Sequence, residues 1–145
     1  MSQRSLSAEC TYFKLQCLHR VMTRYYDGHL SGSGLKGSQL SLLTSVKSLQ
    51  PVRPSDLAVQ LHLDNSTITR TLRTMRERGL VICLPGVDER SRLIALTEAG
   101  QLALTRGRRH WRHAQAAMAE HMSASDISEL HELMDRFTET LDESL

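Results

Sequence analysis

The chain has 145 residues, of which 23% are charged and 40% hydrophobic, and its formal net charge is +2. This length is typical of a single domain with a core of its own. The three cysteines show neither the spacing of a zinc site nor that of a disulfide framework. No apolar run is long enough for a signal peptide or a membrane span, so we expect a soluble, cytoplasmic protein.

The charge is unevenly distributed along the chain. Residues 65–92 contain six arginines and three acidic residues, a balance of +3. Residues 120–145 contain eight acidic residues and one arginine, a balance of −7. A basic middle and an acidic end favour a protein that presents one face to a polyanion and turns the other away.

The first helical pattern runs from about residue 8 to residue 30. It carries two apolar stripes, one through Phe13 and the other through Leu18. A helix that is apolar on two sides must bury both, and a second copy of the chain can cover one of them. We therefore predict a dimerisation helix, followed by a flexible break at residues 31–34.

A second helix is expected over residues 38–49, followed by an extended, proline-containing link at residues 51–54. Its inward positions are Leu40, Leu43, Val46 and either Leu42 or Leu49.

Residues 55–79 predict two short helices joined by a tight turn. Ser55 is the expected N-cap of the first, which buries Leu57, Ala58 and Leu61, with Leu63 pointing back to the core. For the second helix we expect Asp64 as the N-cap, a buried stripe of Ile68, Leu72 and Met75, and Gly79 as the left-handed closing residue. This is the helix-turn-helix pattern, whose second helix usually lies in the DNA major groove.

The polar side chains of the second helix avoid its buried stripe. Hydroxyl groups near a helix N-terminus suit phosphates, and arginines pair with guanine edges or with phosphate. A solvated helix surface is the alternative interpretation of the same pattern. The candidate DNA-contacting residues of this unit are Ser55, Asn65, Ser66, Thr67, Thr69, Arg70, Arg73 and Thr74.

Two runs of β-formers, residues 80–84 and 92–96, predict a hairpin directly behind this unit, which is the place of a wing. Thr97 then caps a long helix over residues 98–121. Ser123 caps the last helix, with Asp126 completing a capping box. The expected inner face of the last helix is Ile127, Leu130, Leu133 or Met134, Phe137 and Leu141.

The segment Asp88-Glu89-Arg90-Ser91 followed by Leu96-Thr97-Glu98-Ala99-Gly100 resembles the wing-and-exit signature of the MarR (multiple antibiotic resistance regulator) family. The resemblance covers nearly the whole chain. It implies a mainly α fold with a small β-hairpin wing, in a single domain over residues 1–145. Within that domain it implies a winged helix-turn-helix lobe at 38–97, a connecting helix at 98–121, and dimerisation helices at 8–30 and 123–145.

The resemblance further implies a homodimer that binds a pseudo-palindromic operator in double-stranded DNA, usually as a repressor. In the wing, Arg90 is expected to enter the minor groove while Asp88 holds it by a salt bridge, and Arg92 is a third candidate contact. An arginine suits the negative potential of a narrow minor groove. A solvated turn is the alternative for these residues.

Two other classes of protein are weighed against a DNA-binding regulator. An enzyme would need a nucleophile–base pair or a glycine-rich phosphate loop, and neither pattern is present, so we expect neither catalysis nor a bound cofactor. The other class is a winged-helix interaction module without sequence-specific DNA binding.

The signal sensed is left open between three alternatives, of which thiol oxidation is the first. Cys10 and Cys17 lie seven residues apart on one helix face, about 10 Å from each other, too far for a disulfide within the helix. A bridge between subunits or to Cys83 remains open, and some relatives in the family are thiol sensors. Both cysteines can equally be small core residues.

Zinc and a small organic anion are the other two alternatives. His110 and His113 have a spacing that two metal ligands can use, completed by His19, His29, Glu9 or Cys10, although no dense ligand cluster exists and we predict no metal site. Aromatic walls with arginines suit a small organic effector. That pocket would be lined by His19, Tyr25, Tyr26, Arg106, Arg109, His110, Trp111 and His113. The alternative interpretation is that the arginines form a solvated or DNA-proximal face and that Trp111 lies in the core.

Overall fold

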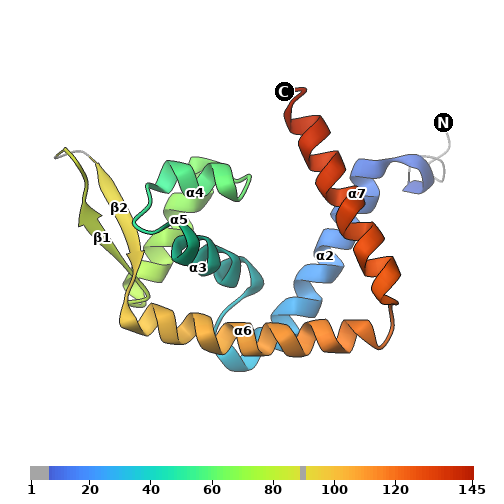
Figure 1. Cartoon of the computed structure of the whole chain (residues 1–145), viewed down its shortest axis with the longest axis horizontal. Coiled ribbons are helices and arrows are strands. Elements are labelled where there is room, and N and C mark those ends of the chain that lie inside the picture. The colour runs from blue at the N-terminus through green and yellow to red at the C-terminus, as the bar shows by residue number, and fades with distance from the viewer. Residues whose placement is uncertain (1–6, 89–90) are drawn as a thin grey trace. The chain divides into compact units, whose positions relative to one another are not determined.

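The structure, a computed structural model, describes residues 7–88 and 91–145. It divides into two compact units, one up to Trp111 and one from Arg112 on. The elements follow in the order α2 (Thr11–Leu30), η1 (Ser31–Ser33), α3 (Gly37–Leu49), α4 (Pro54–Gln60), α5 (Asn65–Glu77), β1 (Val81–Pro85), β2 (Arg92–Leu96), α6 (Glu98–Ala119) and α7 (Ala124–Asp142) (Figure 1). The predicted class, mainly α with one small hairpin, is confirmed.

The core of the first unit is a single apolar cluster. Helix α4 packs on α5, and α5 packs in turn on β1. The choice left open for α3 is decided, because Leu42 is 1% exposed whereas Leu49 is 40% exposed. The cluster consists of Leu30, Leu35, Leu40, Leu42, Leu43, Val46, Val52, Leu57, Ala58, Ile68, Leu72, Met75, Leu80, Val81, Ile94, Ala103 and Leu104.

The hairpin is antiparallel, with Val81 opposite Leu96 and Pro85 opposite Arg92. Val52, in the link before α4, adds a bridge to Ile94 through two backbone hydrogen bonds of 3.0 and 2.7 Å. The link at residues 51–54 therefore ties the hairpin to the helices instead of serving only as a spacer.

Most predicted helix ends are confirmed. The Asp64 carboxylate caps α5, Gly79 follows it with a φ of +73°, and Ser123 and Asp126 form the capping box of α7. The Thr97 hydroxyl accepts from the backbone N–H of Gly100 at 3.0 Å and donates to the carbonyl of Gly79 at 2.6 Å. Thr97 therefore joins the start of α6 to the end of α5.

Several predicted details of the helices are wrong. Helix α4 begins at Pro54 with Arg53 as the N-cap, because a proline needs no N–H in the first turn, so Ser55 lies inside the helix. The first long helix begins at Thr11, since the extended backbone of Cys10 separates it from the helical residues 7–9. Leu63 does not reach the core and is 44% exposed. Helix α6 ends at Ala119, two residues earlier than expected.

The segment at residues 31–34 forms an ordered turn, so the prediction of a flexible break is wrong. Its backbone forms the 3₁₀ turn η1, closed by Gly34 in the left-handed region with a φ of +77°. The Ser33 hydroxyl is buried, donates to the carbonyl of Leu30 at 2.6 Å and accepts from the N–H of Leu35 at 3.1 Å. The glycine and serine content that suggested flexibility here supplies the turn geometry and its internal hydrogen bonds.

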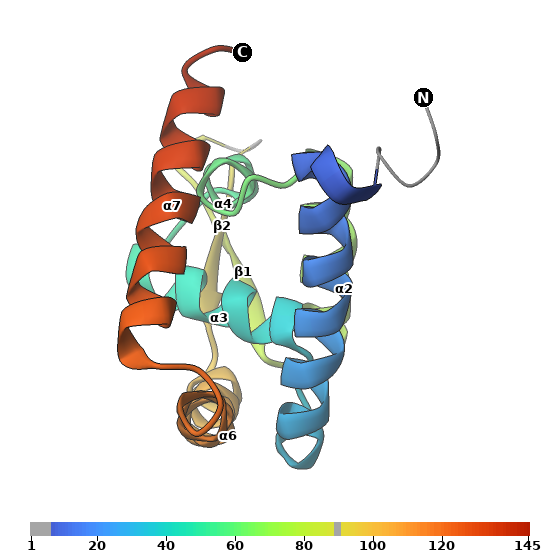
Figure 2. The same ribbon diagram turned by 90° about the vertical axis from the view of Figure 1, so that its right-hand side faces the viewer.

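Helices α2 and α7, both continuous in Figure 2, keep large apolar side chains exposed. On α2, Phe13 is 42% and Val21 is 51% exposed. On α7 no residue is buried, and Phe137 is 48% exposed. Within one chain, neither helix buries its whole apolar stripe. Among the described residues, no helix combines the length and the apolar character needed to cross a membrane.

We predict that Gly100→Ala destabilises the protein, because a Cβ at this position would overlap the backbone carbonyl oxygen of Leu80. Backbone must move to relieve such an overlap, so we expect the free energy of unfolding to fall by about 1–3 kcal/mol. Urea unfolding followed by circular dichroism measures this. Gly28→Ala is the matched control, since a Cβ on Gly28 in α2 meets nothing within 4 Å. Equal stability of the two variants would contradict the close approach.

Candidate nucleic-acid interface

The rotation of α5 about its axis is set by its buried stripe. Ile68, Leu72 and Met75 are at most 7% exposed and belong to the core cluster. The opposite side of the helix is therefore turned to solvent. Of the predicted contact residues on α5, Thr67 is half-buried and the exposed ones are Asn65, Ser66, Thr69, Arg70, Arg73 and Thr74.

The N-terminal end of α5 is organised around the Asp64 carboxylate. Its Oδ1 atom accepts from the backbone N–H of Thr67 at 2.6 Å and from the Ser66 hydroxyl at 2.7 Å. These bonds, first that from the Thr67 N–H and then that from Ser66, lower the pKa of Asp64 to about 2. The Ser66 hydroxyl and the Thr67 N–H, which we expected to bind phosphate, thus donate to a carboxylate of the chain itself. A carboxylate, like a phosphate, is an anion that the N-terminus of a helix stabilises.

The threonine hydroxyls of this face have their hydrogens committed to the helix itself. Thr69 donates to the carbonyl of Asn65 at 2.8 Å, and Thr74 donates to the carbonyl of Arg70 at 3.3 Å. Each oxygen then presents lone pairs outward. In this arrangement Thr69 and Thr74 are acceptors, suited to the amino groups of adenine or cytosine in the major groove rather than to phosphate oxygens.

The arginines of α5 and its C-cap are not equivalent. Arg70 lies along the helix, with Nη2 donating to the Thr67 hydroxyl at 3.3 Å. Arg78 donates to the carbonyl of Gly34 at 2.9 Å and so faces the chain. The side chain of Arg73 is exposed and has no hydrogen bond or ion pair with any described residue. Of the two arginines predicted on α5, Arg73 is thus the one whose donors are free of bonds to described residues.

The wing loop is closed by Asp88. Its Oδ1 atom accepts from both the backbone N–H and the hydroxyl of Ser91 at 2.8 Å. Arg90, which we expected to enter the minor groove, lies with Glu89 outside the described residues, so the expected salt bridge to Asp88 stays a prediction. Arg92 is exposed at the start of β2.

The predicted effector residues are only partly brought together. The ring of Tyr25 lies edge-on to Tyr26, with centroids 5.5 Å apart, and its centroid is 4.6 Å from that of His29. His110 Nδ1 is 3.1 Å from the carbonyl oxygen of His29. Burial raises the pKa of Tyr26. These contacts form an aromatic cluster at the C-terminal end of α2.

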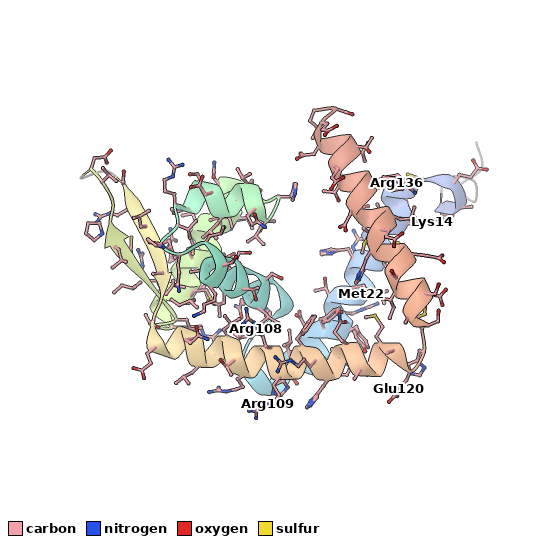
Figure 3. The ribbon with its side chains drawn as sticks, viewed as in Figure 1. Lys14, Met22, Arg108, Arg109, Glu120 and Arg136 are labelled. Atoms are coloured by element: carbon pink, nitrogen blue, oxygen red, sulfur yellow. The ribbon has the colours of Figure 1, made fainter. Side chains whose placement is uncertain are left out.

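The remaining effector candidates lie outside this cluster. His19 and Arg106 are exposed, and Trp111 is 40% exposed, so its interpretation as a core residue is wrong. Arg109 is exposed and leaves α6 on a different side from its half-buried neighbour Arg108 (Figure 3). His113 belongs to the second unit.

All three cysteines have free thiols and are half-buried. Cys10 occupies the N-cap position of α2 and Cys17 lies two turns further along. Within residues 7–88 and 91–145, no three histidine, cysteine or acidic side chains lie close enough to hold a metal ion. The zinc set proposed around His110 and His113 is therefore not assembled in the described part of the chain.

Sequence reasoning missed the tertiary roles of two polar residues. Arg78 counted only as one more charge of the basic segment, and Gln50 was not singled out although its Oε1 atom accepts from the N–H of Leu96 at 2.9 Å. Neither role has a local signal, because the partners are 44 and 46 residues away.

Comparison with known proteins relates the chain to one family of regulators. A sequence model of the MarR family matches residues 35–90. The structure of the transcriptional regulator MosR of M. tuberculosis in complex with DNA matches over 94% of this chain and 98% of that chain, with a TM-score of 0.83 and 28% identity. The chain is thus similar to regulators of the MarR family, and the family model covers its central part. The winged helix-turn-helix fold predicted from the sequence is thereby confirmed.

Two further relatives extend the comparison. The organic hydroperoxide resistance transcriptional regulator of Bacillus subtilis (strain 168) is 33% identical over 91 residues, which are 62% of each protein. The chain spans about three fifths of the length of the curated relatives it matches. A mutant MarR of E. coli complexed with operator DNA shares the fold, with a TM-score of 0.84 and 20% identity over 94% of this chain and 99% of that one.

We predict that the cap of α5 contributes less to stability in acid. The pKa of Asp64 is lowered in the folded protein, so the contribution of its charge is complete above the unfolded pKa near 4 and is lost as the pH falls toward 2. The difference in free energy of unfolding between the wild type and Asp64→Ala should therefore shrink as urea unfolding is measured from pH 6 down to pH 3. Asp64→Asn is the control: asparagine caps a helix without a charge, so its difference in free energy of unfolding from Asp64→Ala should not change over this pH range. A difference between the wild type and Asp64→Ala that stays constant over this range would contradict a stabilising charge on Asp64.

Proposed function

We propose that the protein is a homodimeric transcriptional repressor that binds a pseudo-palindromic operator in double-stranded DNA. The observation that carries this proposal is the exposed face of α5, where Arg73 has no partner among the described residues and is held outward by the buried stripe on the opposite side. In winged helices, the helix that reads the major groove follows a helix and a turn in the chain, precedes the hairpin, and has an exposed basic face.

The comparisons support this proposal at two levels. The relative with 28% identity is a transcriptional regulator whose structure contains DNA, and it covers nearly the whole of this chain. The family is one of DNA-binding regulators and not of enzymes. A winged-helix interaction module without sequence-specific binding is the alternative, and the relative whose structure contains DNA favours DNA binding over it.

The homodimer is supported by the exposed apolar stripes of α2 and α7. Leu130, Leu133 and Phe137 repeat at helical spacing on α7, and each is at least 39% exposed. Exposed side chains of this size at regular helical spacing indicate an interface. A second copy of the chain is the partner we propose, since a symmetric dimer would read the two inverted half-sites of the proposed operator.

For the signal, we favour thiol oxidation at Cys10 over a small organic effector. The relative with 33% identity is named for organic hydroperoxide resistance. Cys10 is half-buried at the N-terminal end of α2, a helix that also carries the apolar stripe of the proposed dimer interface. The aromatic cluster of Tyr25, Tyr26 and His29 is the place where an organic effector would bind instead.

We predict that Arg73→Met weakens binding to the selected operator by about 1–3 kcal/mol, as expected when a guanidinium loses its contact with a base or phosphate. Fluorescence anisotropy with a labelled duplex measures the change. Arg136→Met is the control for charge, because Arg136 lies on α7, outside the helix-turn-helix and the wing. If both variants lost the same affinity, a general charge effect would replace a contact at α5.

We predict that an alkyl hydroperoxide releases the wild type from its operator, and that Cys10→Ser abolishes this response while leaving DNA binding in the reduced state unchanged. Cys17→Ser, on the same helix face, is the matched control and should still respond. Release is followed by anisotropy after addition of the oxidant. A Cys10→Ser variant that responds like the wild type would turn the search to an organic effector.

A further inference from the structure

We propose that Arg78 is a positioning residue for DNA binding, whose guanidinium braces the C-terminal end of α5 against the turn that follows α2. The inference rests on the proposed function, because it concerns how the recognition helix is held and how α2 influences it. It adds to that proposal a residue that touches no DNA.

The brace consists of two hydrogen bonds over a long sequence separation. Arg78 is the C-cap residue of α5. Its Nη2 atom donates to the carbonyl oxygen of Gly34 at 2.9 Å, and its Nη1 atom donates to Oε1 of Gln39 at 3.4 Å. The planar fork of a guanidinium suits two acceptors side by side, which a lysine cannot reproduce.

The main acceptor is held in place by its own turn. Gly34 has a φ of +77°, a conformation in which other residues are strained. The turn before it is fixed by the buried Ser33 hydroxyl, which bonds to the carbonyl of Leu30 and to the N–H of Leu35. The carbonyl of Gly34 is therefore presented by an ordered turn, so a bond to it restricts the position of α5.

The same turn is also held from α6. His110 Nδ1 lies 3.1 Å from the carbonyl oxygen of His29, and a Cβ on Gly32 would lie only 3.0 Å from Cε1 of the His110 ring. The turn thus contacts α6 on one side and α5, through Arg78, on the other. The end of α2 is therefore linked to the end of α5 through a single turn.

This use of Arg78 distinguishes it from its neighbours on α5. A guanidinium already bonded to a carbonyl and an amide oxygen has fewer donors left for phosphate. The side chain of Arg76 is exposed and has no partner in the part of the chain that the structure describes, so Arg76 is a matched control on the same helix.

The first test is the salt dependence of operator binding for Arg78→Met, Arg78→Lys and Arg76→Met, measured by anisotropy between 50 and 200 mM salt. Removing a phosphate contact lowers the slope of log K against log salt by about one, whereas removing a brace leaves the slope unchanged. We expect Arg78→Met to bind about tenfold more weakly with the wild-type slope, and Arg78→Lys to recover part of the loss because it can still reach Gly34. Any loss in Arg76→Met should come with a shallower slope.

Unchanged affinity in Arg78→Met, or a slope lower by about one, would overturn the proposal. A second readout needs no DNA: backbone amide exchange at Gly34 and Leu35 should be at least about fivefold faster in Arg78→Met than in Arg76→Met. Equal exchange would overturn the brace even if the wild type bound no duplex, so failure of the brace and failure of the proposed function are distinguishable. If Arg78→Met does not fold, the same two readouts on Arg78→Lys decide.

Discussion

The structure depends on one constraint, the burial of three side chains on a single side of α5. Ile68, Leu72 and Met75 enter the same core cluster as the residues of α3, α4 and the hairpin. Because these side chains are packed, α5 cannot rotate without exposing apolar surface, which costs about 25 cal/mol for each Å². Everything assigned to the opposite face, Arg73 above all, follows from that orientation.

The polar groups around α5 divide into those bonded within the chain and those left for a partner. Asp64 engages Ser66 and the N–H of Thr67, and Arg78 engages the turn after α2. The groups that remain outward include Arg73, Arg76 and the lone pairs of Thr69 and Thr74. A winged helix that reads DNA needs both groups, since the first fixes the helix and only the second carries sequence information. This division supports a reading surface better than it supports a merely solvated face.

Local signals predicted most of the fold. The 3.6-residue apolar period located α5, Asp64 and Ser123 marked helix starts, and Gly79 marked an end, because each of these effects acts within a few residues. Ser55 failed as a cap because Pro54 takes the first helical position. The prediction of a flexible break at residues 31–34 failed because glycine and serine occur in flexible linkers and in ordered turns alike. Arg78 and Gln50 were beyond local reasoning, since their partners lie more than forty residues away.

The most direct test is a selection of random duplex DNA on the purified protein. An oriented α5 in a two-fold dimer predicts enrichment of an inverted repeat whose half-sites lie about one helical turn apart. The same experiment with Arg73→Met should give weaker enrichment at the positions that Arg73 contacts. A wild-type protein that enriches no sequence, under conditions in which it is folded, would contradict the account and favour a winged helix that binds another protein.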